Sequence, residues 1–94
     1  MTVIGAQHKG RSLKYIRLAA FLAAQQEDVE TLLLTFDEIE SVLGQKLPAN
    51  SRYPSWWGND ERRGHSRAWL TAGWHVTRFD AREETVELER APLL

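Results

Sequence analysis

The spacing of apolar residues changes from a helical period to a strand period at Gly73, and this change constrains the fold most strongly. Before Gly73, apolar residues recur at helical spacing in several short segments. After it, residues 74–79 and 85–89 are rich in strand formers and are separated by a polar turn, which predicts an antiparallel hairpin. A chain of 94 residues has room for one domain. We therefore predict an α+β domain with an N-terminal helix, two or three short central helices and a small antiparallel sheet.

The N-terminal part of the chain predicts one long helix. Residues 1–10 contain two glycines and show no clear period, so we expect a flexible leader before a single domain formed by residues 11–94. Ser12 has a side chain suited to a helix N-cap. An apolar stripe follows over residues 13–26, where Leu18 and Leu22 lie on one face.

A capping box at Thr35 marks the start of a second helix. Residues 29–34 are short, branched and apolar, which predicts a strand just before it. The Thr35 hydroxyl can accept a hydrogen bond from the Glu38 amide, and the Glu38 carboxylate can accept one from the Thr35 amide. Gly44 is a natural C-terminal stop, so this helix is expected to end near Leu43.

The middle of the chain predicts two further short helices. Pro48 suits the first position of a helix over residues 49–53, which Pro54 ends or kinks. A turn signal at residues 58–60 precedes another short helix, expected over residues 65–72. These helices are expected to connect the capped helix to the hairpin.

Four tryptophans lie between positions 56 and 74. Adjacent residues on a helix point about 100° apart, so one of Trp56 and Trp57 is expected in the core and the other at the surface. The exposed one would be an anchor for a protein or for a stacked base. The residues expected to be deeply buried are Ile39, Trp69, Trp74 and Leu88.

Charge is distributed in blocks along the chain. Residues 27–40 carry six acidic and no basic side chains, whereas residues 41–78 carry six basic and two acidic ones. Such blocks either form opposite faces or neutralise each other across the fold. The net charge of −1 lacks the strong basic bias of most small nucleic-acid binders.

No pattern in the sequence indicates catalysis, and we expect no enzyme, no metal and no cofactor. The chain has no cysteine, and His8, His65 and His75 do not have the spacing of a metal site. There is no phosphate-binding glycine loop and no nucleophile elbow. The longest apolar run, residues 18–24, is too short for a membrane span, and no signal peptide is recognisable. These features favour a cytoplasmic protein without a membrane contact.

A set of short patterns lies between residues 34 and 76, within a wider similarity that covers roughly residues 14–90. It comprises Leu34, Thr35, Phe36, Asp37, Glu38, Ile39, Glu40, Leu43, Gly44, Leu47, Pro48, Trp56, Trp57, Asn59, His65, Ala68, Trp69, Leu70, Ala72, Gly73, Trp74 and Val76. Together these residues resemble a family of small domains of unknown function that occur in bacteria and their phages, alone or fused to other domains. The resemblance implies a bacterial or phage origin, and this context favours DNA binding by analogy.

The predicted order of elements resembles a winged helix-turn-helix. In this interpretation residues 36–43 form the supporting helix, residues 49–57 the groove-facing helix and residues 74–89 the wing. Lysine and arginine then contact phosphates, while asparagine and tyrosine lie nearest the bases. The predicted DNA-binding residues are Lys46, Asn50, Arg52, Tyr53, Arg62, Arg63 and Arg67.

Two features count against DNA binding and leave an alternative open. Pro54 interrupts the proposed groove-facing helix, and the proposed wing carries acidic residues that phosphate would repel. The alternative is a protein-interaction module that docks on a host or cognate protein, or forms a homodimer, through the exposed member of Trp56 and Trp57 together with arginine.

Overall fold

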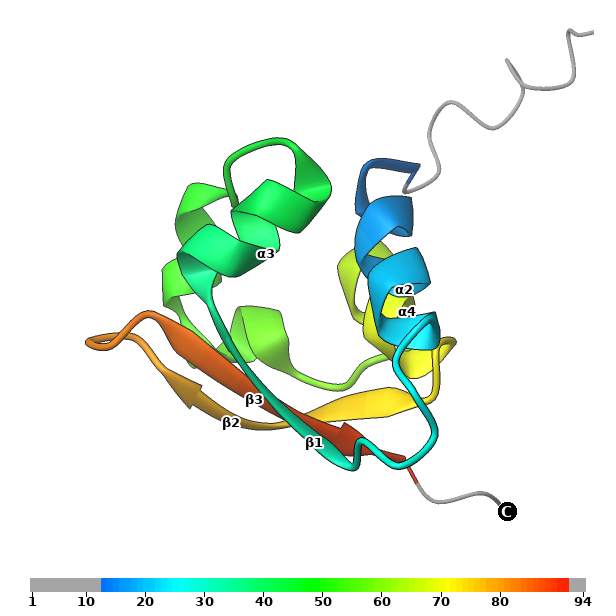
Figure 1. Ribbon diagram of the computed structural model, residues 1–94. Helices are drawn as coiled ribbons and strands as arrows, with labels where there is room; N and C mark the ends of the chain where they lie inside the picture. The colour runs from blue at the N-terminus through cyan, green and yellow to red at the C-terminus, as the bar shows by residue number, and fades with distance from the viewer. Residues whose placement is uncertain (1–12, 92–94) are drawn as a thin grey trace, which may run out of the picture.

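The computed structural model describes residues 13–91 and has two layers, with the helices on one side of a small sheet (Figure 1). The predicted leader and the Ser12 cap lie outside the described residues. The α+β prediction is confirmed. In chain order the elements are the 3₁₀ helix η1 (Leu13–Tyr15), α2 (Ile16–Ala23), β1 (Thr31–Thr35), α3 (Phe36–Leu43), the 3₁₀ helices η2 (Ala49–Arg52) and η3 (Pro54–Trp57), α4 (Gly64–Leu70), β2 (Trp74–Asp80) and β3 (Thr85–Arg90).

The sheet is antiparallel with strand order β1-β3-β2. The predicted hairpin is confirmed as β2 and β3, and the predicted strand before the capping box is confirmed as β1, which begins two residues and ends one residue later than predicted. Val86 and Leu88 on β3 are buried toward the helices, while Glu87 and Glu89 point to the other face. The register of β2 shifts between Val76 and Arg78.

The capped helix α3 forms as predicted. The Thr35 hydroxyl accepts from the Glu38 amide at 3.0 Å, and the Glu38 carboxylate accepts from the Thr35 amide at 2.9 Å. Gly44 ends the helix in the left-handed conformation with φ 78°, which glycine adopts without a Cβ clash. The local sequence therefore determines both ends of α3.

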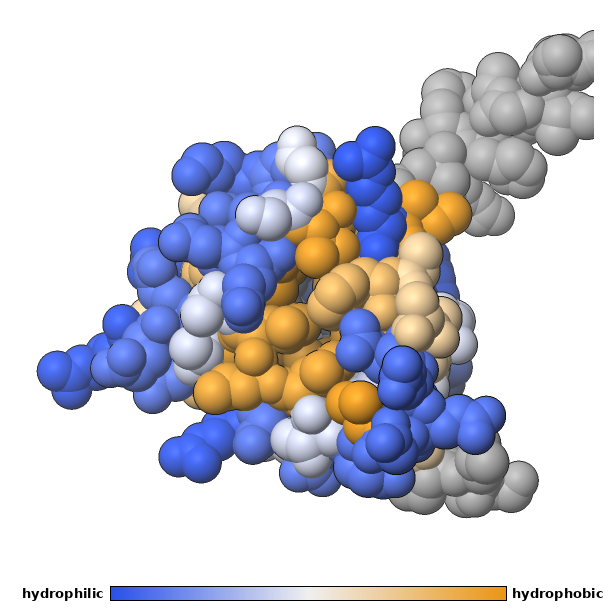
Figure 2. All heavy atoms as spheres, in the orientation of Figure 1, coloured by the Kyte–Doolittle hydropathy of each residue, from blue (hydrophilic) through white to orange (hydrophobic). Residues whose placement is uncertain are grey.

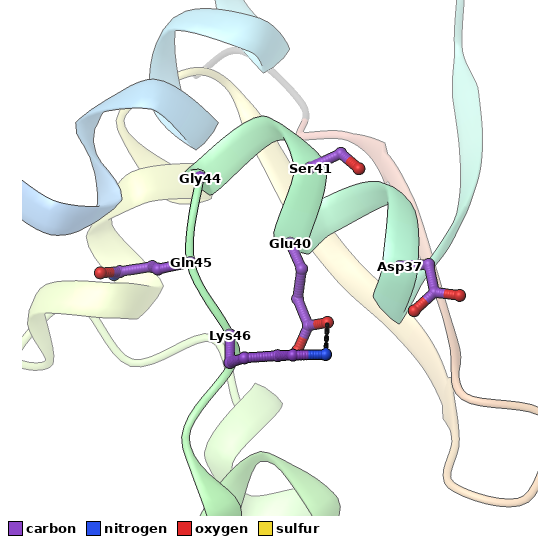
Figure 3. Close-up of a pocket in the computed structure, with 6 residues that line it drawn as sticks. All are labelled: Asp37, Glu40, Ser41, Gly44, Gln45 and Lys46. Atoms are coloured by element: carbon purple, nitrogen blue, oxygen red, sulfur yellow. Dashed lines mark ion pairs between the residues drawn. The ribbon is translucent and has the colours of Figure 1, made fainter.

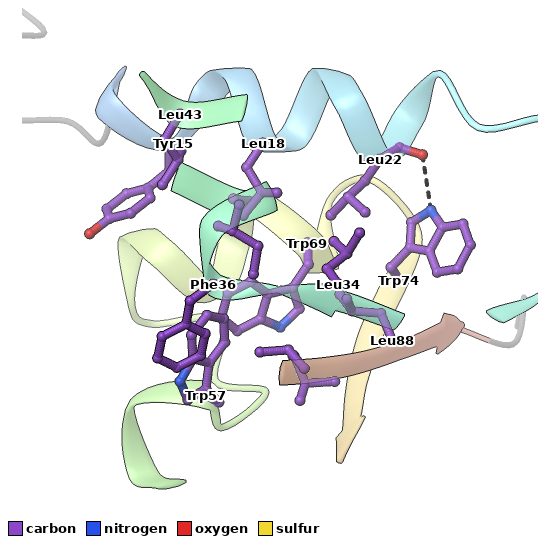
Figure 4. Packing of buried hydrophobic residues seen from close by; sticks show 14 of the residues in the cluster. Tyr15, Leu18, Leu22, Leu34, Phe36, Leu43, Trp57, Trp69, Trp74 and Leu88 are labelled. Carbon is purple, nitrogen blue, oxygen red and sulfur yellow. Dashed lines mark hydrogen bonds between the residues drawn. The ribbon is translucent and has the colours of Figure 1, made fainter. Parts of the chain in front are cut away.

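The N-terminal helix is shorter than predicted, because side chains from the sheet take the carbonyls at its C-terminal end. The Trp74 indole donates to the Leu22 carbonyl at 3.0 Å (Figure 4). Arg90 donates to the carbonyl of Gln26 at 2.7 Å and stacks over the Trp74 ring at 4.4 Å. Helix α2 therefore stops at Ala23, before the predicted end at residue 26.

The prediction of one helix over residues 49–57 is wrong. Two 3₁₀ helices, η2 and η3, form in its place. Tyr53 lies between them in an extended conformation (φ −102°, ψ 138°). A proline disfavours the α conformation of the residue before it, so Pro54 breaks the segment at Tyr53. Pro48 is the N-cap of η2, one position before its predicted place.

All four tryptophans lie in the hydrophobic core, which Figure 4 shows in part, and the rings of Trp56, Trp57 and Trp69 contact one another. Trp69 and Trp74 are deeply buried as predicted, as are Ile39 and Leu88. The expectation that one of the adjacent tryptophans would be exposed is wrong: Trp56 is 7% exposed and Trp57 is 3% exposed.

The Trp56–Trp57 pair lies inside the core because the two side chains reach different parts of it. The Trp57 ring stacks on Phe36, Trp69 and Phe79 with centroids 5.6–5.8 Å apart. The Trp56 ring lies edge-on to Trp57 at 4.7 Å. A 3₁₀ turn that is enclosed by apolar residues can bury both adjacent tryptophans. On a helix at the surface, adjacent side chains point about 100° apart, so only one of them faces the core.

Side-chain hydrogen bonds hold the long connection between α3 and α4. The Trp57 indole donates to the Ser51 carbonyl at 2.7 Å. At the other end, the Asn59 amide oxygen accepts from the Trp69 indole at 2.9 Å and from the Val76 amide at 2.8 Å, and its nitrogen donates to the Val76 carbonyl at 2.9 Å. Asn59 thus joins the connection to both α4 and β2.

We predict that Asn59→Ala lowers the free energy of unfolding by about 1–3 kcal/mol, because it leaves the Trp69 indole and the Val76 backbone without their partner. Urea unfolding followed by tryptophan fluorescence measures the change. The matched control is Asn50→Ala, an exposed asparagine on η2, which should stay within about 0.5 kcal/mol of the parent. Equal effects of both variants would contradict this role of Asn59.

Candidate functional site

An open hollow of about 540 Å³ lies beside η2 and η3 and brings three of the predicted site residues together. Asn50 and Tyr53 come from the connection after α3, and Arg63 precedes α4. The lining residues are Asn50, Tyr53, Ser55, Trp56, Arg63 and His65. The hollow therefore combines an aromatic surface with a guanidinium and several hydrogen-bonding groups.

A stacked pair, Trp56 and His65, forms one part of the lining. The two rings are parallel within 2°, and their centroids are 3.9 Å apart. His65 Nε2 lies 2.7 Å from the Trp56 carbonyl oxygen. Because a carbonyl only accepts, the neutral ring carries its proton on Nε2 and leaves Nδ1 as an acceptor.

The environment of His65 favours this neutral form. Burial lowers the pKa of His65 below its ordinary value, and the positive charge of Arg63 acts in the same direction. The hydrogen bond to Trp56 opposes these two effects. The net result is an uncharged, polar ring in the wall of the hollow at neutral pH.

Tyr53 has the most exposed large aromatic side chain of the described residues, at 63%. Its backbone is fixed on both sides: its amide donates to the Asn50 carbonyl at 3.1 Å, and its carbonyl accepts from the Trp56 amide at 3.0 Å. The Tyr53 ring takes part in none of the ring–ring contacts found within residues 13–91. A rigid backbone thus presents a free aromatic ring to solvent.

Asp60 organises the two neighbouring arginines. Arg62 binds the Asp60 carboxylate through two guanidinium nitrogens, at 2.9 and 3.0 Å, and Arg63 approaches it at 3.7 Å. These contacts lower the pKa of Asp60 to about 2, chiefly through the Arg62 hydrogen bond. Arg63 also donates to the Ser55 carbonyl at 2.9 Å. Both guanidinium groups are therefore held in place while they stay accessible to solvent.

The two other predicted arginines are also exposed, and each makes a contact through its side chain. Arg52 contacts Glu84 of the β2–β3 turn at 2.6 Å. Arg67, on α4, donates to the Glu61 carbonyl at 3.1 Å. Neither residue lines the hollow.

Lys46 belongs to a different part of the surface (Figure 3). It lines a separate hollow of about 370 Å³ together with Asp37 and Glu40, and its Nζ lies 3.8 Å from the Glu40 carboxylate. Lys46 thus lies beside acidic side chains, and it does not line the hollow that contains Asn50, Tyr53 and Arg63.

Sequence reasoning missed the part that His65 and Ser55 play in lining the hollow. The His65–Trp56 stack depends on the course of the chain between η3 and α4, and no regular spacing indicates it. Within residues 13–91 no group of histidine and carboxylate side chains is arranged to hold a metal ion. In the same part of the chain, each helix is too short or too polar to cross a membrane.

We predict that stability falls below about pH 6.5 partly because of His65. Its folded-state pKa lies below its ordinary value of 6.5, so the unfolded chain binds the proton more readily and protonation favours unfolding. Urea midpoints measured from pH 7.5 to 5 should decrease less steeply for His65→Gln than for the parent. Parallel profiles for the two proteins would contradict the burial of a neutral His65.

No curated protein and no solved structure matched this chain. A family model described as "Domain of unknown function (DUF7662)" matches residues 15–91, which include every element from α2 to β3. The chain belongs to this family of domains of unknown function.

Proposed function

We propose that this domain binds DNA without catalysis, through the surface that surrounds the hollow. In this proposal Arg52, Arg62, Arg63 and Arg67 contact phosphates, and Asn50 and Tyr53 lie nearest the bases. One observation carries it: Asn50, Tyr53 and Arg63, which the sequence singled out separately, line a single open hollow.

The geometry and exposure of the Arg62 and Arg63 side chains support phosphate binding. A guanidinium fork matches the geometry of phosphate, and Arg62 already adopts a two-nitrogen contact with the Asp60 carboxylate. The side chains of Arg62 and Arg63 are 87% and 46% exposed. Exposed ion pairs add little stability, so phosphate can replace the carboxylate at small cost.

The order of elements gives further support. The α-helices and strands follow one another as α2, β1, α3, α4, β2 and β3, as in a winged helix-turn-helix, although η2 and η3 lie between α3 and α4 where that motif has a short turn. In this arrangement α4, and not residues 49–57, takes the position of the second helix. Arg63 at its N-cap and Arg67 one turn later are exposed. Arg52 partly neutralises the acidic turn between β2 and β3 through Glu84.

We predict opposite effects for two changes at this surface. The double change Arg62→Ala/Arg63→Ala should weaken binding to all sequences and lower the slope of log K against log salt by roughly two units. Asp60→Asn keeps one side-chain oxygen but removes its charge, so it should tighten binding. The measurement is a fluorescence polarisation titration at two salt concentrations, with a short duplex that carries a single-stranded overhang.

The control for this titration is Arg17→Ala, which removes an exposed charge from α2 and should leave the slope nearly unchanged. Absence of binding by the folded parent at low salt would contradict the proposal. Binding that survives the double change would retain DNA as the ligand but exclude these arginines.

A second candidate function is docking to a protein, and an apolar patch favours it. Figure 2 shows this patch over β1 and between α2 and α3. Leu32 on β1 and Val42 on α3 are half-buried on the helix side of the sheet, whereas Leu33 is 66% exposed on the opposite face, beside Glu87. Because Trp56 and Trp57 are buried, they do not provide the anchor that the sequence suggested. Association that is insensitive to salt and is lost in Val42→Asp would favour this function.

A further inference from the structure

We infer that the hollow takes one unpaired nucleotide, so that the domain prefers single-stranded DNA or strand ends to an intact duplex. This inference rests on the proposed function and specifies its ligand. It follows from the size of the hollow, the freedom of the Tyr53 ring and the distribution of positive charge.

The size of the hollow fits a single nucleotide. Its volume of about 540 Å³ lies within the range of about 300–1,000 Å³ that is typical of small-molecule sites. In a duplex the base faces are stacked in the interior, so an intact duplex offers such a hollow its backbone and its base edges but no base face. An unpaired base has no such restriction and can enter.

The lining residues offer the contacts that an unpaired base uses. Single-strand binding proteins stack bases on exposed aromatic rings, and the Tyr53 ring is free for such a contact. The Asn50 amide has both donors and an acceptor for a base edge, and His65 Nδ1 adds an acceptor. Arg63 supplies the positive charge for the adjoining phosphate. Because every base has a flat face, stacking on Tyr53 predicts little sequence preference.

Charge outside the hollow favours a strand over a free nucleotide. The exposed Arg62 side chain lies next to Arg63 in the chain but does not line the hollow. Exposed Arg52 and Arg67 likewise lie outside it. One nucleotide has a single backbone phosphate, whereas a strand has further phosphates for these side chains. A strand should therefore bind more tightly than its monomer.

The test compares three probes by competition against a labelled oligothymidylate: the unlabelled oligothymidylate, a blunt duplex of equal length, and thymidine monophosphate. The single strand is expected to compete best. Equal competition by the blunt duplex would overturn the inference while the proposed function stands. Equal competition by the mononucleotide would also overturn it. If the labelled oligothymidylate does not bind while the duplex of the polarisation titration does, the inference fails and the proposed function stands; if neither binds, both fail.

Variants of Tyr53 locate the contact. Tyr53→Ala should weaken single-strand binding roughly 5- to 150-fold, which corresponds to the loss of about 1–3 kcal/mol for one stacked base. Tyr53→Phe retains the ring and should bind nearly as the parent does. Binding to the blunt duplex should change little in either variant. An equal loss for strand and duplex in Tyr53→Ala would overturn the inference. Because Tyr53 is exposed, both variants should keep the parent's urea midpoint.

Discussion

The hydrogen bonds of Asn59 hold together the three parts of the molecule on which the candidate site depends. Its amide joins the connection after η3 to the Trp69 indole on α4 and to the backbone of Val76 on β2. The connection between α3 and α4 contains no strand and no α-helix, so much of its backbone is not paired by regular structure. Side chains such as Asn59 and Trp57 provide hydrogen-bond partners for this backbone. The hollow lies where these hydrogen bonds hold the connection in place.

The aromatic residues of the connection between α3 and α4 differ in what they contact. Trp57 packs entirely within the core, against Phe36, Trp69 and Phe79. Trp56 packs on Trp57 and also supports the ring of His65 in the lining of the hollow. The conformation imposed by Pro54 leaves Tyr53 at the surface, beside this rigid aromatic cluster. The core thus presents the exposed Tyr53 ring and the exposed side chains of Arg62 and Arg63. None of these three residues lies in an α-helix.

The elements that could be predicted from sequence are those that local chemistry determines. The capping box at Thr35, the stop at Gly44 and the period of two after Gly73 each depend on a few neighbouring residues, and all three are present in the structure. The end of α2 could not be predicted, because Trp74 binds the Leu22 carbonyl and Arg90 binds the Gln26 carbonyl just after the helix, both from more than fifty residues away. The burial of both Trp56 and Trp57 follows from tertiary packing around a 3₁₀ turn. For the same reason the sequence indicated Asn50, Tyr53 and Arg63, but neither their common hollow nor the separation of Lys46 from it.

Mapping the contact in the native protein would show whether DNA binds at the hollow beside Tyr53. Backbone and indole ¹H–¹⁵N spectra recorded during titration with an oligothymidylate report every region of the domain at once. We expect the largest shift changes at Asn50, Tyr53, Arg63 and His65 and at the Trp56 indole. We expect little change along β1. Changes concentrated at Val42 and the apolar patch, or spread evenly over the domain, would contradict the account.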